Sequence, residues 1–93
     1  MMQDIQKLRK RIDEIDEQIL RLLSERAEIC RSIGFLKRDN EIPITDLNRE
    51  SEIYAKIKGK APDFGLDAEQ VEAIYRQIVN MCSTVQESKE TRE

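Results

Sequence analysis

The first forty residues carry a regular pattern of apolar positions within an otherwise polar and charged segment. Apolar side chains recur in steps of three and four, with one gap, at Ile5, Leu8, Ile12, Ile15, Ile19, Leu22, Ile29, Ile33 and Leu36. This spacing is typical of a helix with a heptad seam. The pattern continues across Gly34. It predicts one helix over about 4–38, with Asp4 as its N-cap and Lys37 and Arg38 near its C-terminus.

A second, shorter helix follows a loop. Pro43 disfavours helical backbone at the residue before it. Asp46 can then cap a helix over about 46–58, and Gly59 is expected to end it. The segment from Gly59 to Gly65 also contains Pro62. Glycine and proline interrupt helices, so this segment is predicted to be another loop.

The strongest local start signal belongs to a third helix. Asp67 and Gln70 form a capping-box pattern, which predicts a helix over about 67–88. Its expected buried face carries Val71, Ile74, Tyr75, Ile78, Cys82 and Val85. The predicted fold class is therefore all-α, with three helices in a single domain over 1–93.

The length of the first helix predicts a second copy of the chain. At 1.5 Å per residue the helix is roughly 50 Å long. A compact monomer of this size has a radius of gyration of only about 12 Å. The helix therefore extends beyond any core that one chain can build. The simplest way to cover its apolar stripe is a homodimer.

Composition and charge exclude several classes of function. The formal net charge is −3, which argues against a nucleic-acid partner. No apolar run is long enough for a membrane helix, and no secretion signal is recognisable, so we expect a cytoplasmic protein. There is no histidine, so the usual general base and the commonest metal ligand are missing. We expect no metal and no cofactor. Two cysteines, Cys30 and Cys82, have a spacing that suggests neither a disulfide framework nor a zinc site.

Arg26 occupies a position where the apolar stripe calls for isoleucine or leucine. One explanation is a buried ion pair, or a charge that sets the register of the helix seam. The other is an anionic ligand, because a buried arginine needs a negative partner. Lys37 lies three turns further on, about 20° away around the helix and about 16 Å along it. Alone, Lys37 is explained by its place at a helix C-terminus.

The other candidates also have ordinary explanations when each is considered alone. Gln86 lies one turn beyond Cys82 on the buried face, where a glutamine can cap backbone groups or face a ligand oxygen. Asp46, Arg49 and Glu50 in the first turn of the second helix suit capping and surface pairing.

Arg9 flanks the seam near the start of the first helix, as a surface arginine can. It is about 42 Å from Lys37 along one helix. The two can therefore meet one small ligand only if an antiparallel second copy supplies Arg9.

Taken together, these residues resemble the all-α (AroQ-type) chorismate mutase family. The resemblance covers nearly the whole chain and rests on the order and spacing of several segments. They are Leu8-Arg9, Leu22-Leu23-Ser24-Glu25-Arg26, Ile33-Gly34 with Lys37, Ile42-Pro43-Ile44-Thr45-Asp46-Leu47-Asn48-Arg49-Glu50, Gly65-Leu66-Asp67 and Cys82 with Gln86.

The resemblance implies an intertwined homodimer with two shared active sites. It also implies an isomerase that converts chorismate to prephenate in phenylalanine and tyrosine biosynthesis, without a cofactor. Arg26 and the Arg9 of the partner chain would bind the two substrate carboxylates. Lys37 and Gln86 would be the catalytic residues, donating hydrogen bonds to the ether oxygen.

The second helix would recognise the remainder of the substrate. By the same resemblance, the backbone of Asp46 and the side chain of Glu50 would hold the ring hydroxyl, and Arg49 would contact a carboxylate. Cys82 departs from the family pattern, because serine is usual at this substrate-binding position. A thiol keeps the size of serine but is a poorer hydrogen-bond donor.

Two alternatives remain open at this point. An isochorismate-pyruvate lyase shares the fold and the cationic pocket, although the Asp46, Arg49 and Glu50 segment favours the mutase. A non-catalytic helical dimerisation module would use Arg26 only to set register.

Overall fold

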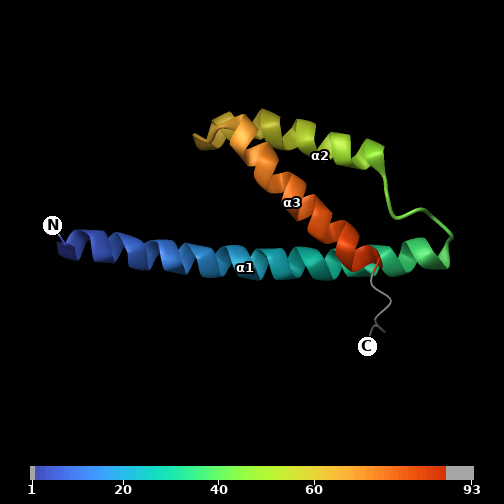
Figure 1. Ribbon diagram of the computed structural model, residues 1–93, viewed down its shortest axis with the longest axis horizontal. Coiled ribbons are helices and arrows are strands. Elements are labelled where there is room, and N and C mark those ends of the chain that lie inside the picture. Colours follow the sequence, from blue (N-terminus) through green and yellow to red (C-terminus); the bar gives the residue numbers. More distant parts are fainter. Residues whose placement is uncertain (1, 88–93) are drawn as a thin grey trace.

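The computed structural model describes residues 2–87 as three α-helices and one short 3-10 helix (Figure 1). They are α1 (Met2–Asp39), α2 (Leu47–Lys60), η1 (Ala61–Phe64) and α3 (Ala68–Glu87). This part of the chain contains no strand, so the all-α prediction is confirmed. The α-helix bounds agree with the predicted ones to within two residues. Met1 and residues 88–93, which belong to the predicted domain, lie outside the described residues.

Helix capping explains where α2 and α3 begin. The Asp46 carboxylate accepts a hydrogen bond from the Arg49 amide at 3.0 Å, and the Asp67 carboxylate accepts one from the Gln70 amide at 2.9 Å. Both bonds satisfy amides that the first turn of a helix leaves without partners. The predicted N-cap of α1 is wrong, because Asp4 already lies inside the first turn. There its negative charge still complements the helix dipole.

The predicted end of the second helix at Gly59 is also wrong. The helix passes through Gly59, because a single glycine weakens a helix by only about 1 kcal/mol. The 3-10 helix η1 follows directly, with Pro62 in its first turn, where the fixed backbone angle of proline is tolerated. The reversal occurs at Gly65, whose φ of 71° is the left-handed conformation that favours glycine.

Helix α3 lies between the other two α-helices and packs against both. It crosses the C-terminal half of α1 on one side and carries α2 on the other (Figure 1). Among the described residues the buried apolar side chains are Cys30, Ala61 and Val79. One prediction for the inner face of α3 is wrong, because Ile74 is 58% exposed in this single chain.

Charged side chains join α2 to α3 on the outside of the molecule. Lys58 lies 3.4 Å from Glu69 and 3.2 Å from Glu72, and Arg76 also pairs with Glu72. Arg76 and Lys58 together lower the pKa of the Glu72 carboxyl. Any stabilisation from this cluster is therefore present above the ordinary pKa of glutamate and is lost as the pH falls through the lowered one.

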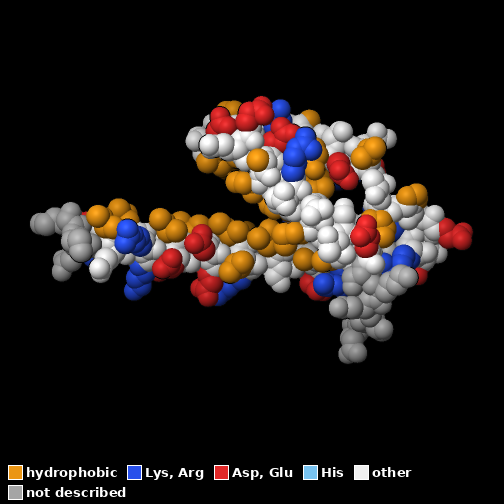
Figure 2. All heavy atoms as spheres, viewed as in Figure 1, with side chains coloured by type: hydrophobic (Ala, Val, Ile, Leu, Met, Phe, Trp, Pro, Cys, Tyr) orange, Lys and Arg blue, Asp and Glu red, His pale blue; other side chains and the backbone are white. Residues whose placement is uncertain are grey.

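The N-terminal half of α1 makes no packing contact with the rest of the described chain. Every residue from 4 to 22 is exposed, and Figure 2 shows hydrophobic side chains along one edge of this rod. The molecule is 58 Å long with a radius of gyration of 16.9 Å. The predicted extension of α1 beyond the core is thus confirmed. No helix in the described part of the chain is long and apolar enough to cross a membrane.

Gly34 marks a close approach of α1 to α3. A Cβ atom added there would lie 2.7 Å from the Cα of Gln86 and 2.9 Å from its carbonyl oxygen. Arg38, one turn later on α1, donates to the same carbonyl. The absence of a side chain at Gly34 therefore allows α1 to reach the last turn of α3.

We expect Gly34→Ala to lower the free energy of unfolding by about 1–2 kcal/mol, because backbone must move to admit the methyl group. Gly59→Ala is the matched control. It is also inside a helix, but a Cβ there meets no atom within 4 Å, so it should raise stability by about 0.5–1 kcal/mol. Urea unfolding followed by circular dichroism measures both. Equal stability of the two variants would contradict the close approach.

Candidate functional site

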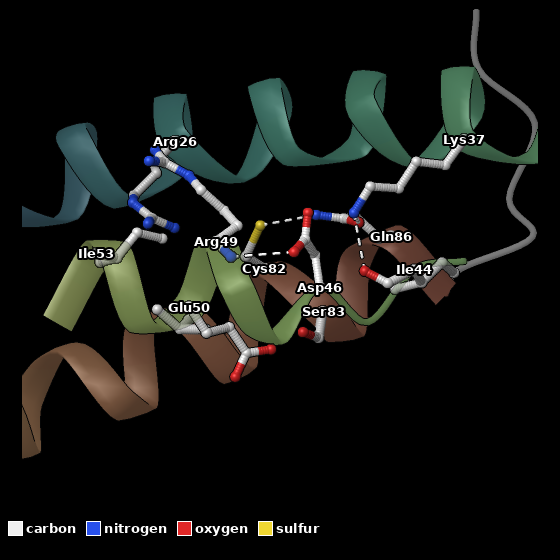
Figure 3. A pocket seen from close by; sticks show the side chains of 11 residues that line it. Arg26, Lys37, Ile44, Asp46, Arg49, Glu50, Ile53, Cys82, Ser83 and Gln86 are labelled. Carbon is white, nitrogen blue, oxygen red and sulfur yellow. Dashed lines mark hydrogen bonds between the residues drawn. The ribbon is translucent and has the colours of Figure 1, made fainter. Parts of the chain in front are cut away.

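An open hollow lies between α1, the start of α2 and the C-terminal half of α3 (Figure 3). Every predicted site residue except Arg9 borders it. Its lining comprises Arg26, Lys37, Ile44, Asp46, Arg49, Glu50, Ile53, Val79, Cys82, Ser83 and Gln86. Residues from opposite ends of the sequence are therefore brought together where α3 crosses α1.

Arg9 is not near this hollow. It lies on the exposed N-terminal half of α1, seventeen positions before Arg26, which is about 25 Å along the helix. Because α1 is one continuous helix, the Arg9 side chain cannot reach the hollow of its own chain.

Lys37 projects from the last turns of α1 into the hollow and is held by two acceptors. Its Nζ donates to the carbonyl oxygen of Ile44 at 2.8 Å and to Oε1 of Gln86 at 2.9 Å (Figure 3). An ammonium group carries three N–H donors. These two bonds leave one donor of Lys37 for a ligand.

Gln86 is the most buried polar side chain among the described residues, with 6% of its surface exposed. Its Oε1 accepts from Lys37, so its amide nitrogen turns the other way and donates to Sγ of Cys82 at 3.0 Å. The amide has a second N–H. The side chain therefore does not cap backbone groups, as the alternative explanation supposed. Lys37 and Gln86 instead present neighbouring donors to the hollow.

Arg26 is half-buried and has no carboxylate of the described chain within ion-pair distance. Its Nη1 lies 3.8 Å from Sγ of Cys30, which is a weak contact for a cation. An ion pair within this part of the chain is thus not the reason for its place in the apolar stripe. The guanidinium is therefore available to bind an anionic ligand. Its planar arrangement of N–H donors suits a carboxylate.

The first turn of α2 supplies the opposite wall. The Asp46 carboxylate accepts from the Arg49 amide, and the Asp46 carbonyl oxygen accepts from the Glu50 amide at 3.0 Å, so the backbone N–H of Asp46 is the group left for a ligand. The Arg49 guanidinium forms an ion pair with Glu52. Glu50 is half-buried and supplies an acceptor at the edge of the hollow.

The structure corrects the interpretation of the cysteines. Cys30 and Cys82 form a disulfide between α1 and α3, with their Cα atoms 5.4 Å apart. That separation is within the usual range for disulfides. The pairing could not be predicted from the sequence, because the two cysteines are 52 positions apart and only the crossing of the two helices brings them together.

Several residues that border the hollow or support it were not predicted from the sequence. The missed lining residues are Ile44, Ile53, Val79 and Ser83. Val79 and Ser83 precede Gln86 by seven and three positions, a helical spacing that could have identified them. Arg38, which holds the Gln86 carbonyl, had only its charge as a signal.

The hollow suits a small ligand with two or more negative groups. It combines the cations of Arg26, Lys37 and Arg49 with the buried amide donor of Gln86 and the half-buried carboxylate of Glu50. Within the described residues, no cluster of three or more Asp, Glu, Cys or His side chains is arranged to hold a metal ion. The chemistry that these groups can supply is electrostatic: they bind charge, orient a ligand and donate hydrogen bonds.

Comparison with known proteins assigns the chain to a family. The family model of chorismate mutase type II matches residues 8–87. A chorismate mutase of Methanocaldococcus jannaschii is 36% identical over 67 residues, which cover 72% of this chain and 68% of that protein. A bifunctional chorismate mutase/prephenate dehydratase of Aquifex aeolicus is 40% identical over 88 residues, or 91% of this chain.

The lengths of these relatives differ widely. The matched region is only 24% of the Aquifex aeolicus protein. A 4-amino-4-deoxychorismate mutase of Streptomyces pristinaespiralis is 31% identical over 72 residues, covering 77% of this chain and 56% of that protein. Since the family model covers residues 8–87, which include every residue of the hollow, this chain belongs to the chorismate mutase type II family.

Proposed function

We propose that this chain is a chorismate mutase, an isomerase that converts chorismate to prephenate in phenylalanine and tyrosine biosynthesis. The observation that carries the proposal is the arrangement of Lys37 and Gln86. They are 2.9 Å apart and present donors to a hollow that also contains Arg26, which has no carboxylate partner in the described chain. The family membership names the substrate class that such a site suits.

The reaction needs what this site can supply. In the rearrangement one C–O bond breaks as one C–C bond forms, with no proton transfer and no covalent intermediate. The enzyme must hold a flexible dianion in its reactive shape and stabilise the charge that develops on the ether oxygen. A millionfold acceleration corresponds to about 8 kcal/mol of transition-state stabilisation. A chain without histidine can do this.

Arg26 would bind one substrate carboxylate, and Arg9 of the partner subunit would bind the other. Arginine is suited to both roles because its guanidinium can donate two parallel hydrogen bonds to a carboxylate. The dianion would also neutralise Arg26, whose positive charge lies half-buried without a carboxylate of its own chain nearby.

Lys37 and Gln86 would stabilise the ether oxygen. Each retains one donor after its bonds within the protein. The oxygen gains negative charge as the C–O bond stretches, so both hydrogen bonds strengthen in the transition state. The side-chain oxygen of Gln86, Oε1, faces Lys37. The side chain therefore presents its N–H donor, and not an acceptor, to the ether oxygen.

The first turn of α2 would recognise the ring hydroxyl. The Asp46 backbone and the Glu50 carboxylate lie on the α2 side of the hollow, and Arg49 would contact a carboxylate from there. Isochorismate carries its hydroxyl elsewhere on the ring, so this wall favours chorismate over the substrate of the lyase.

A homodimer would complete the site. The apolar stripe of α1 runs from position 5 to position 36, so its midpoint lies between Leu20 and Arg21. If two α1 helices pair antiparallel about a twofold axis at that midpoint, the residue numbers of any two facing residues sum to 41. Arg9 then faces position 32 of its partner. Position 32 lies between Arg26 and Lys37. The same pairing would cover the exposed stripe and deliver Arg9 to the hollow. The single domain, the cytoplasmic location and the lack of a nucleic-acid partner stay predictions from the sequence.

Incubation of the purified protein with chorismate tests the function directly. We expect the ultraviolet absorbance of chorismate to fall and prephenate to be the product by mass spectrometry. Isochorismate and 4-amino-4-deoxychorismate are offered in parallel. Pyruvate release from isochorismate, with no prephenate from chorismate, would assign the lyase instead.

Lys37→Ala and Arg26→Ala should each reduce kcat/KM for chorismate on the order of 10²- to 10³-fold, because each removes a charged group that faces the substrate. Lys56→Ala is the matched control, since Lys56 is an exposed lysine of α2 outside the hollow. It should retain wild-type kcat/KM. Circular dichroism establishes that the variants are folded. Near-normal turnover of a folded Arg26→Ala protein would refute the mechanism.

Gln86→Glu should move the activity optimum to acidic pH. A carboxylate repels the ether oxygen, and only its protonated form can donate a hydrogen bond to it. The ammonium of Lys37, which lies beside this position, stabilises the carboxylate and moves the rise in activity further toward low pH. A profile of kcat against pH measures the shift. If the profile of the variant is as flat as that of the wild type, Gln86 does not face this oxygen.

A mixed dimer tests whether Arg9 crosses between subunits. Dimers of Arg9→Ala alone or Lys37→Ala alone have two defective sites. In a dimer with one chain of each kind, the hollow that keeps Lys37 receives an intact Arg9 from its partner. We therefore expect purified mixed dimers, made by co-expression with two affinity tags, to regain roughly half of wild-type turnover. No recovery, with both parent dimers defective, would show that Arg9 does not act across the interface, and a monomer by light scattering would refute the shared site.

A further inference from the structure

The Cys30–Cys82 pair lies in the wall of the candidate site. Cys82 is half-buried and borders both the main hollow and a smaller one, whereas Cys30 is 4% exposed and borders only the smaller hollow. The Cys82 side of the pair therefore faces the substrate side, and Cys30 is shielded. Access to one side of a disulfide is what thiol–disulfide exchange in a folded protein requires.

Both sulfur atoms contact side chains that the proposed reaction uses. Sγ of Cys82 accepts a hydrogen bond from the amide nitrogen of Gln86 at 3.0 Å (Figure 3). Sγ of Cys30 lies 3.8 Å from Nη1 of Arg26. A change in the state of these sulfurs therefore acts on the ether-oxygen donor and on the carboxylate-binding cation at once.

We propose that Cys30 and Cys82 are a reversible dithiol–disulfide pair whose oxidation state controls the catalytic site. In the closing step, one cysteine thiolate attacks a low-molecular-weight disulfide and releases one thiol from it. The second cysteine thiolate then displaces the second thiol, and the Cys30–Cys82 bond forms. The pair loses two protons and two electrons, and the disulfide reagent is reduced to two thiols. A dithiol reductant runs the same exchange in reverse.

The two states differ in what Cys82 offers to the hollow. A disulfide sulfur carries no hydrogen, so it can only accept the Gln86 bond. A thiol carries one hydrogen and can also donate weakly toward a ligand. The disulfide also ties α1 to α3, which stabilises the crossing against unfolding. The oxidised form should thus be the more stable and the less active form. The activity part of this inference rests on the proposed function, but the thiol chemistry does not.

The first experiment follows the thiols without any assay of activity. The full-length protein is equilibrated with oxidised glutathione or with dithiothreitol, then alkylated and examined by mass spectrometry. We expect oxidation to remove two hydrogen atoms and both alkylation sites within one chain, and dithiothreitol to restore them in the folded protein. The melting temperature of the oxidised form should be higher by roughly 10 °C or more.

The second experiment compares kcat/KM for chorismate in the two states. We expect the reduced form to exceed the oxidised form by roughly two- to tenfold, the range that one hydrogen bond supplies. Cys30→Ser is the control, because it lacks the pair but keeps a small polar side chain beside Arg26 and the Cys82 thiol at the hollow. Its kcat/KM should match that of the reduced wild type, and its melting temperature should not respond to oxidised glutathione.

Three results would overturn the proposal. The first is that both thiols can still be alkylated after treatment with oxidised glutathione. The second is a disulfide that joins two chains instead of closing within one. The third is equal kcat/KM for the two states in an active enzyme, once mass spectra have verified both states. A protein with no mutase activity would refute the proposed function alone. The mass and melting-temperature measurements would then still decide whether the pair opens and closes.

Discussion

The contact on which the rest of the molecule depends is the crossing of α3 over the C-terminal half of α1. The two helices meet closely at Gly34 because that residue has no side chain to hold the Gln86 backbone away. Arg38 fastens the same backbone through its carbonyl. This one approach places the Gln86 amide beside Lys37 and brings Cys82 to Cys30. The donors of the site therefore come from the packing of the fold and not from a mobile loop.

The crossing uses only half of α1, and the other half has no role within one chain. An isolated rod with exposed isoleucines and leucines is unfavourable in water, because that apolar surface is removed from solvent only by a partner. The stripe therefore links stability to the site. In the proposed dimer, a second copy that covers the stripe would also bring Arg9 to the hollow, so one event would complete both the core and the set of cations.

Periodicity and capping predicted the helices well because both are local. The steps of three and four and the carboxylates of Asp46 and Asp67 act within one or two turns. The lining of the hollow was predictable mainly through resemblance, since the spacing on one helix could join only Arg26 to Lys37. Where the outcome depends on packing between distant segments, the sequence was misleading or silent. The disulfide, the exposure of Ile74 and the role of Gly34 are all of this kind.

The half-buried charge of Arg26 favours an anionic ligand in the site. Within a stripe of leucine and isoleucine this cation weakens the helix seam unless an anion approaches, and the described chain places no carboxylate there. The protein as a whole is acidic, so a dianion is attracted by the local cluster of cations and not by the net charge. In the proposed mechanism, binding a dianion would relieve the electrostatic cost of Arg26, while Lys37 and Gln86 would keep donors for an oxygen that is still nearly neutral. The substrate carboxylate would then be bound by the arginine in the ground state, and the lysine and the glutamine would act mainly in the transition state. That division of roles allows binding to be favourable without reducing the differential stabilisation on which the rate depends.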